Sequence, residues 1–108
     1  MIEHIFTVEQ KTNLHERTLS VEQQKRLVTI ACELYPSGIA ENRIWAEAGG
    51  DISAIATNTN GKTQWREAIK KISHGGGGNI TYLSLIQAML EDNANNKSLM
   101  ELLGILSK

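Results

Sequence analysis

A phosphate-binding motif is nearly complete between Ala56 and Thr63, where the sequence reads ATNTNGKT. In loops of the pattern G-x-x-x-x-G-K-T, the glycines let backbone N–H groups surround phosphates, and the lysine reaches them. Alanine replaces the first glycine here, and the preceding residues 51–55 are too short and polar for a buried strand. No second strand carrying a metal-binding aspartate is visible. We therefore interpret residues 57–62 as a polar loop and Thr63 as the cap of a following helix.

The glycine run 75–78, which follows His74, resembles the oxyanion-hole loop of esterases. That chemistry also requires a nucleophile elbow with the pattern Gly-x-Ser-x-Gly. The sequence contains no such pattern. We interpret the run as the end of a helix followed by a flexible linker.

The single cysteine, Cys32, could act as a thiol nucleophile if a histidine lay beside it. It falls in the middle of an amphipathic segment, next to the predicted buried face, which favours a small buried or half-buried residue. His4, His15 and His74 are scattered and do not form a metal-ligand spacing with it. We therefore assign no catalytic residue, metal or cofactor, and we expect a protein that is not an enzyme.

The length, net charge, apolar content and cysteine count of the chain limit the class of protein further. A chain of 108 residues suits one domain with its own core, and a net charge of −1 argues against broad electrostatic binding to nucleic acid or an anionic membrane. No apolar run approaches the length of a membrane span, and the N-terminus does not read as a signal peptide. One cysteine permits no internal disulfide, which fits a reducing compartment. We expect a cytoplasmic protein.

Helical signals repeat from Ser20 to the end of the chain. Ser20 and Gln23 form a capping box, and Pro36 ends the helix that they begin. Further helices are predicted from Ser37–Gly38 to Ala48, briefly after Asp51, after Thr63, after Asn79 or Thr81, and from about Lys97. Residues 1–19 fit no period and are interpreted as an N-terminal arm, followed by a helical domain over residues 20–108.

Apolar residues at helical spacing give each predicted helix a buried face. No segment shows the sustained alternation of a sheet, so we predict an all-α fold, a compact bundle of five to six short helices. Trp45 and Trp65 lie at core positions. The predicted inward residues are Leu27, Ile30, Ala31, Leu34, Ile44, Trp45, Ala48, Ile52, Ile55, Trp65, Ala68, Ile69, Ile72, Leu83, Ile86, Met89, Leu90, Leu99, Leu102, Leu103 and Leu106.

Charge is distributed unevenly along the chain. Residues 1–60 carry five basic and eight acidic side chains, whereas residues 61–108 carry six basic and four acidic ones. We predict two interaction faces, a basic one with Lys62, Arg66, Lys70 and Lys71, and an acidic one with Glu41, Glu47 and Asp51. Complementary faces favour encounter between two copies, and a contact between two different patches can extend into a chain of copies. Most such patterns are ordinary solvated surfaces, which is the alternative.

Several segments, in order, resemble a known family, the bacterial effector-associated domain, type 1. These are Leu34–Ser37 (LYPS), Arg43–Ser53 (RIWAEAGGDIS), Trp65–Ile69, Leu83–Leu90 and Asn93–Leu99, so the resemblance covers about residues 20–106. The closing turn departs from the family pattern, because Asn93 and Ala94 stand where an aromatic residue and a proline are expected.

This resemblance implies a helical bundle similar to the death-fold superfamily. It also implies a non-catalytic adaptor in a bacterial immune or conflict system, which couples an effector such as a protease or TIR-type enzyme to a sensor. The implied partner is a like domain, on the same or a companion protein, so the resemblance is consistent both with a homo-oligomer and with pairing to a different like domain. A helical nucleic-acid-binding regulator, with residues 63–73 as its recognition helix, is the alternative. A nucleotide binder using Gly61-Lys62-Thr63 is a third hypothesis.

Overall fold

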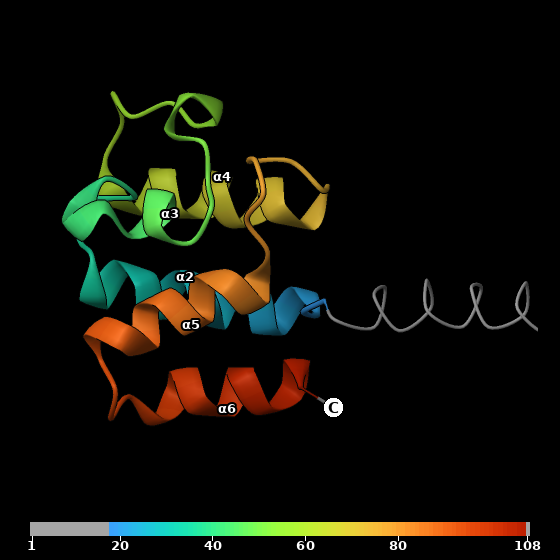
Figure 1. Cartoon of the computed structure of the whole chain (residues 1–108). Coiled ribbons are helices and arrows are strands. Elements are labelled where there is room, and N and C mark those ends of the chain that lie inside the picture. The colour runs from blue at the N-terminus through green and yellow to red at the C-terminus, as the bar shows by residue number, and fades with distance from the viewer. Residues whose placement is uncertain (1–17, 108) are drawn as a thin grey trace, which may run out of the picture.

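The computed structural model describes residues 18–107, and this part of the chain is an all-helical bundle, as predicted (Figure 1). Figure 1 shows α2 and α5 in a middle layer, α3 and α4 above them and α6 below. The α-helices are α2 (Val21–Leu34), α3 (Ile44–Glu47), α4 (Gly61–Ser73), α5 (Tyr82–Asp92) and α6 (Lys97–Leu106). Two short 3₁₀ turns, η1 (Glu41–Arg43) and η2 (Ile52–Ala54), lie on either side of α3 in the chain.

Side-chain caps define where the longer helices begin. The predicted capping box of α2 is confirmed, because Ser20 Oγ accepts from Gln23 N at 3.2 Å and Gln23 Oε1 accepts from Ser20 N at 2.8 Å. Thr81, not Asn79, caps α5, and Ser84 completes a second capping box. These local patterns place two helix starts correctly.

The start of α4 differs from the prediction. Asn60 caps this helix, since its side-chain oxygen accepts from Thr63 N at 2.8 Å. Gly61 and Lys62 therefore belong to the first turn, and Thr63 is the third helical residue rather than the cap. Asparagine is at least as good an N-cap as threonine, so the earlier of two competing caps is used.

The helix predicted from Ser37–Gly38 to Ala48 is interrupted. Asn42 and Arg43 have φ angles of +52° and +55°, in the left-handed region. A right-handed helix cannot continue through such residues, so the segment divides into η1 and the single turn of α3. The predicted inward residues of α3, Ile44 and Trp45, are nevertheless buried.

The core contains both tryptophans, each fully buried, as predicted. Most of the other predicted core residues are buried as well, but Leu34, Leu83, Leu90 and Leu103 are only partly buried and pack at its edge. Ile52 is 38% exposed. The buried face of α5 instead includes Tyr82 and Leu85. A wide apolar stripe does not show which of its edges faces the neighbouring helix.

The glycine run 75–78 is not a flexible linker, contrary to the prediction. Asp51 N donates to Gly77 O at 2.7 Å, and Asn79 N donates to Gly49 O at 3.0 Å, so the run pairs with the turn after α3. Gly77 and Gly78 have φ angles of +94° and +103°. These two conformations favour glycine and allow the backbone to close over the Trp45 ring.

The two ends of the described chain lie at the same end of the bundle (Figure 1). The N-terminal end of α4 and the C-terminal end of α5 lie at the opposite end. Of the predicted arm, residues 1–17 fall outside the described residues, whereas Leu19 is buried and its carbonyl accepts from Gln24 Nε2 at 2.9 Å. Within residues 18–107, no helix has the length and apolarity to cross a membrane.

Candidate protein-docking surface

The predicted basic residues lie on the solvent side of α4. Lys62, Arg66 and Lys70 are exposed and recur every four residues, so they follow one side of the helix, which we call the basic α4 side. Lys71 lies about two and a half turns after Lys62, which places it on the opposite flank. Its aliphatic chain passes Gly76, where a Cβ atom would stand 3.2 Å from Lys71 Cγ. The structure therefore groups three of the four predicted cations.

The cations of the basic α4 side have no acidic partner within the described part of the chain. Residues 18–107 contain one ion pair, between Arg26 on α2 and Glu101 on α6. Lys62 also lies in the first turn of α4, which contains no acidic residue. A helix N-terminus carries a positive partial charge, so a lysine there is unfavourable unless an anion comes near. This surface is therefore suited to an acidic partner.

Cys32 lies on α2 near the basic α4 side and is half-buried. Burial raises the pKa of its thiol above the ordinary value of 9.0, while Lys62 and Arg66 act in the opposite direction by smaller amounts. The thiol is the weaker nucleophile in its protonated form. A structural role for Cys32 agrees with this setting.

The predicted acidic residues lie on the short elements between α2 and α4. Glu41 accepts a hydrogen bond from Ser37 N at 2.8 Å. Asp51 caps η2, because one carboxylate oxygen accepts from Ser53 Oγ at 2.7 Å and from Ser53 N at 3.0 Å. These two bonds, with the hydroxyl first, lower the pKa of Asp51. Glu47 is exposed. Two of the three carboxylates therefore already serve the local fold.

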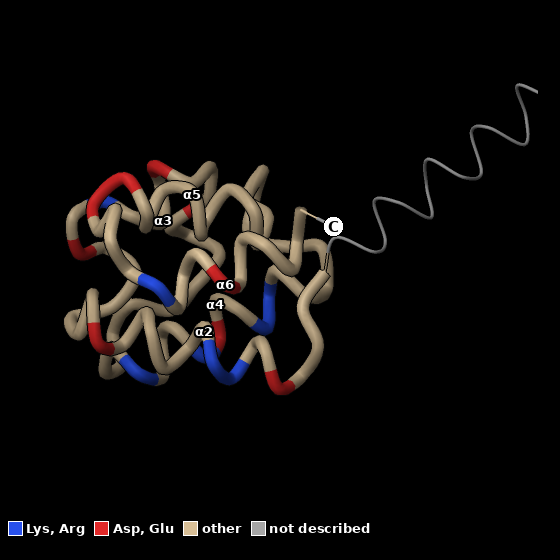
Figure 2. Tube along the Cα trace, turned by 90° about the horizontal axis from the view of Figure 1, so that it is seen from below, with Lys and Arg blue, Asp and Glu red and all other residues tan. Residues whose placement is uncertain are grey.

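A second acidic group was missed by the sequence analysis. Glu91 and Asp92 are the last two residues of α5, and both are exposed. Figure 2 shows acidic positions on the side of α3 and α5, and most basic positions, interspersed with acidic ones, near α2 and α4. The signal that could have found this group is an acidic pair at the end of a predicted helix, just before the polar break at Asn93.

Tyr35 connects this acidic group to the core. Its hydroxyl donates to Asp92 Oδ2 at 2.8 Å and accepts from Asn93 Nδ2 at 3.2 Å. Burial, and then the bond to Asp92, raise the pKa of Tyr35 well above its ordinary value of 10.0. Burial also raises the pKa of Tyr82. Both tyrosines thus stay protonated in the folded chain at pH values where they ionise in the unfolded chain.

This difference predicts a loss of stability at alkaline pH. As pH rises above about 10, the unfolded chain loses tyrosine protons first, so the free energy of unfolding falls. We expect Tyr35→Phe to cost about 0.5–1.5 kcal/mol at pH 8, where Asp92 and Asn93 lose a partner. Above pH 10 the variant should lose stability less steeply than the wild type. Urea unfolding of the wild type and the variant, at pH 8 and at several pH values above 10, measures the free energy of unfolding. If this free energy fell equally steeply with pH in both proteins, the prediction would be contradicted.

Residues 56–63, which resemble a phosphate-binding loop in sequence, are held against the helical bundle. They follow the 3₁₀ turn η2 rather than a strand, and Gly61 lies in α4. Gln64 is buried, and its Nε2 donates to the carbonyls of Thr57 and Thr59, at 3.3 and 2.9 Å. The Oε1 atom of Gln64 accepts from Ile39 N at 3.1 Å. The loop is therefore held against the bundle by a buried amide that the sequence analysis did not single out.

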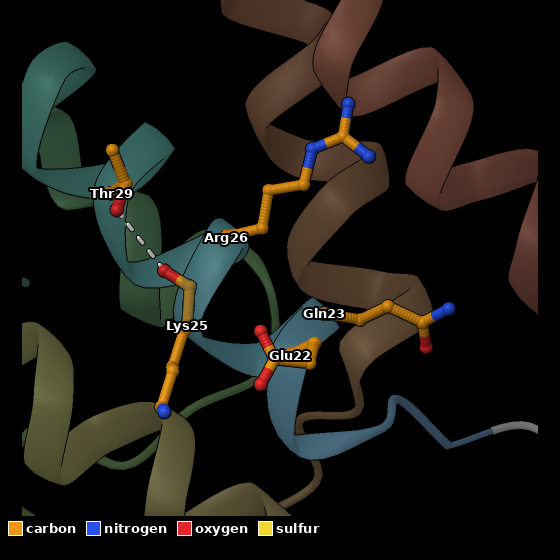
Figure 3. Close-up of a pocket in the computed structure, with 5 residues that line it drawn as sticks. All are labelled: Glu22, Gln23, Lys25, Arg26 and Thr29. Atoms are coloured by element: carbon orange, nitrogen blue, oxygen red, sulfur yellow. Dashed lines mark hydrogen bonds between the residues drawn. The ribbon is translucent and has the colours of Figure 1, made fainter.

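Other candidate sites offer no converging groups. Within the described residues, no three His, Cys, Asp or Glu side chains gather as metal ligands. An open pocket lies along α2, lined by Glu22, Gln23, Lys25, Arg26 and Thr29 (Figure 3). Figure 3 shows Lys25 pointing toward α4 while Arg26 and Gln23 point away from it. These diverging side chains of mixed charge do not enclose a ligand.

Comparison with known proteins identified a family match. A family model described as Effector-associated domain 1 matches residues 17–107, which include every residue that the structure describes. No curated protein and no solved structure matches.

Proposed function

This chain belongs to the Effector-associated domain 1 family, and we propose that it is a non-catalytic adaptor domain that docks onto a like domain. In this proposal, docking couples an effector to a sensor protein in the cytoplasm of a bacterial immune or conflict system. The partner is another copy of a like domain, on the same or a companion protein. The domain itself needs no metal or cofactor for this role.

The observation that carries the proposal is the basic α4 side. Three exposed cations follow one helix, and the sole ion pair among residues 18–107 involves none of them. Charges arranged in this way speed encounter with an acidic surface and fix its register. A nucleic-acid-binding role is not favoured, because Lys71 lies on the other flank from Arg66 and the net charge of the chain is −1.

Reversing two of these charges tests the proposal. We expect the double variant Arg66→Glu, Lys70→Glu to associate at least about tenfold more weakly than the wild type, because its surface then repels an acidic partner. Light scattering after gel filtration, over a range of concentration and salt, gives the size of the species. Exposed charges contribute little to stability, so the circular dichroism spectrum should not change.

Lys71→Glu is the matched control, since it reverses a neighbouring charge on the other flank of α4 and should leave association unchanged. Association of the wild type should weaken with added salt. An unchanged affinity of the double variant would count against the basic α4 side. A wild-type domain that stays monomeric under every condition, and that also fails to bind like domains encoded beside it, would count against docking itself.

A further inference from the structure

The C-terminal end of α5 carries charges of an unfavourable sign. A helix C-terminus has a negative partial charge, so lysine or arginine stabilises it and carboxylates do the opposite. The last two residues of α5 are Glu91 and Asp92, and its last turn contains no basic residue. We call Glu91 and Asp92 the acidic α5 end.

Within residues 18–107, the acidic α5 end forms no ion pair with a basic side chain. Asp92 receives one neutral hydrogen bond, from the Tyr35 hydroxyl, and neither carboxylate forms an ion pair. Glu41 adds to the same negative field, since it also acts on the Tyr35 hydroxyl. The folded chain therefore keeps a like-charge arrangement that weakens it, and a cation supplied from outside would relieve it.

The basic α4 side also begins with a charge that is unfavourable at its helix end, and here the charge is positive. Lys62 stands at the positive end of the α4 dipole, with no acidic residue in the first turn. Both helix ends lie at the same end of the bundle, away from residues 18 and 107 (Figure 1). One chain thus carries two unfavourable charged helix ends whose signs are complementary.

We propose that the acidic α5 end of one copy docks against the basic α4 side of a second copy of this chain. The inference rests on the proposed docking function and names its acidic surface. A second copy is the partner that fits, because both members of the complementary pair are present on this chain and neither forms an ion pair within its described part. The contact joins two different patches, so each copy contributes one surface and retains the other.

Two half-blocked variants test this arrangement. The acid-blocked variant is Glu91→Lys, Asp92→Asn, in which the oxygen of the new amide can still accept the Tyr35 hydrogen bond. The base-blocked variant is Lys62→Glu, Arg66→Glu. We expect each variant alone to associate at least about tenfold more weakly than the wild type. Mixed in equal amounts they should form one-to-one dimers with near wild-type affinity, because each copy keeps one intact surface.

Sedimentation velocity of the single variants and of their mixture measures these species. The acid-blocked variant should also melt at a higher temperature than the wild type, because a lysine replaces a carboxylate at the negative end of α5. Its weaker association would then not come from unfolding. Glu47→Lys is the matched control, a charge reversal at an exposed acidic residue outside the proposed contact, and it should associate like the wild type.

The outcomes separate this inference from the proposed function. A wild type that associates while the acid-blocked variant associates equally well would overturn the inference and leave docking intact. A mixture of the two variants that stays monomeric, or a loss of association in Glu47→Lys alone, would also overturn it. A wild type that binds only a different like domain would support docking and reject the second copy as partner.

Discussion

Replacing Trp65 with alanine is expected to lower the free energy of unfolding by about 3–5 kcal/mol. The indole is fully buried, and its ring centroid lies 6.0 Å from that of Tyr35. Its Nε1 donates to the Tyr35 carbonyl at 2.9 Å. The substitution therefore opens a cavity between α2 and α4 and removes one of two donors to the Tyr35 carbonyl, which keeps its bond from Gly38 N at 3.1 Å.

Urea unfolding followed by circular dichroism measures this loss. Small domains are stable by only about 5–15 kcal/mol, so the alanine variant should be partly unfolded at moderate temperature. Trp65→Phe separates the two contributions, because it keeps a ring in the cavity and removes the hydrogen bond. It should lose clearly less stability than the alanine variant. Equal losses would show that the hydrogen bond, and not packing, determines the effect.

Substituting alanine for glycine is expected to have opposite effects in two helices. In a helix this change normally stabilises by about 0.5–1 kcal/mol. At Gly104, on the exposed side of α6, no atom lies within 4 Å of the new Cβ, so Gly104→Ala should show this gain. At Gly61, the new Cβ would overlap the Pro36 carbonyl oxygen. Gly61→Ala should instead destabilise, by about 1–3 kcal/mol or more.

Thermal or urea unfolding of both variants shows directly whether each substitution stabilises or destabilises the domain. Gly61 lies where the first turn of α4 crosses the end of the Pro36 turn, and two backbone segments must move apart to admit a methyl group. A stabilised Gly61→Ala variant would show that this approach is looser than the structure describes. Gly104→Ala serves as the control for the general effect of alanine in a helix.

The parts of the fold that the sequence predicted correctly depend on neighbours within one helix. Ser20 and Gln23 are three residues apart, so their capping box can be recognised without any other segment. The burial of Trp65 follows from a spacing of three and four residues along α4. Such short-range patterns predict the existence of each long helix and, for α4, its buried face.

The parts that could not be predicted depend on contacts between distant segments. The left-handed turn at Asn42 and Arg43 ends a helix that its composition favours. The glycine run reads as a linker until its pairing partner, Gly49 to Asp51, is brought beside it. Short local motifs cannot show a pairing of segments that the whole of α4 separates in the chain.

The candidate surface shows the same division. The spacing of Lys62, Arg66 and Lys70 is local, and it correctly placed three exposed cations on one side of α4. The acidic α5 end was missed because charges were counted for each half of the chain. The sign of a charge matters relative to the helix end where it stands, and that requires the end of α5 to be known.

The shared position of residues 18 and 107 at one end of the bundle bears on how the domain can be joined to other sequences (Figure 1). Fusion directly before residue 18 or directly after residue 107 places the attached polypeptide at the end of the bundle away from the acidic α5 end and the first turn of α4. The domain can also be grafted into a surface loop of a host protein, because a host needs only closely spaced attachment points to receive it. The fold thus has its connections at one end of the bundle, and the acidic α5 end and the first turn of α4 at the other.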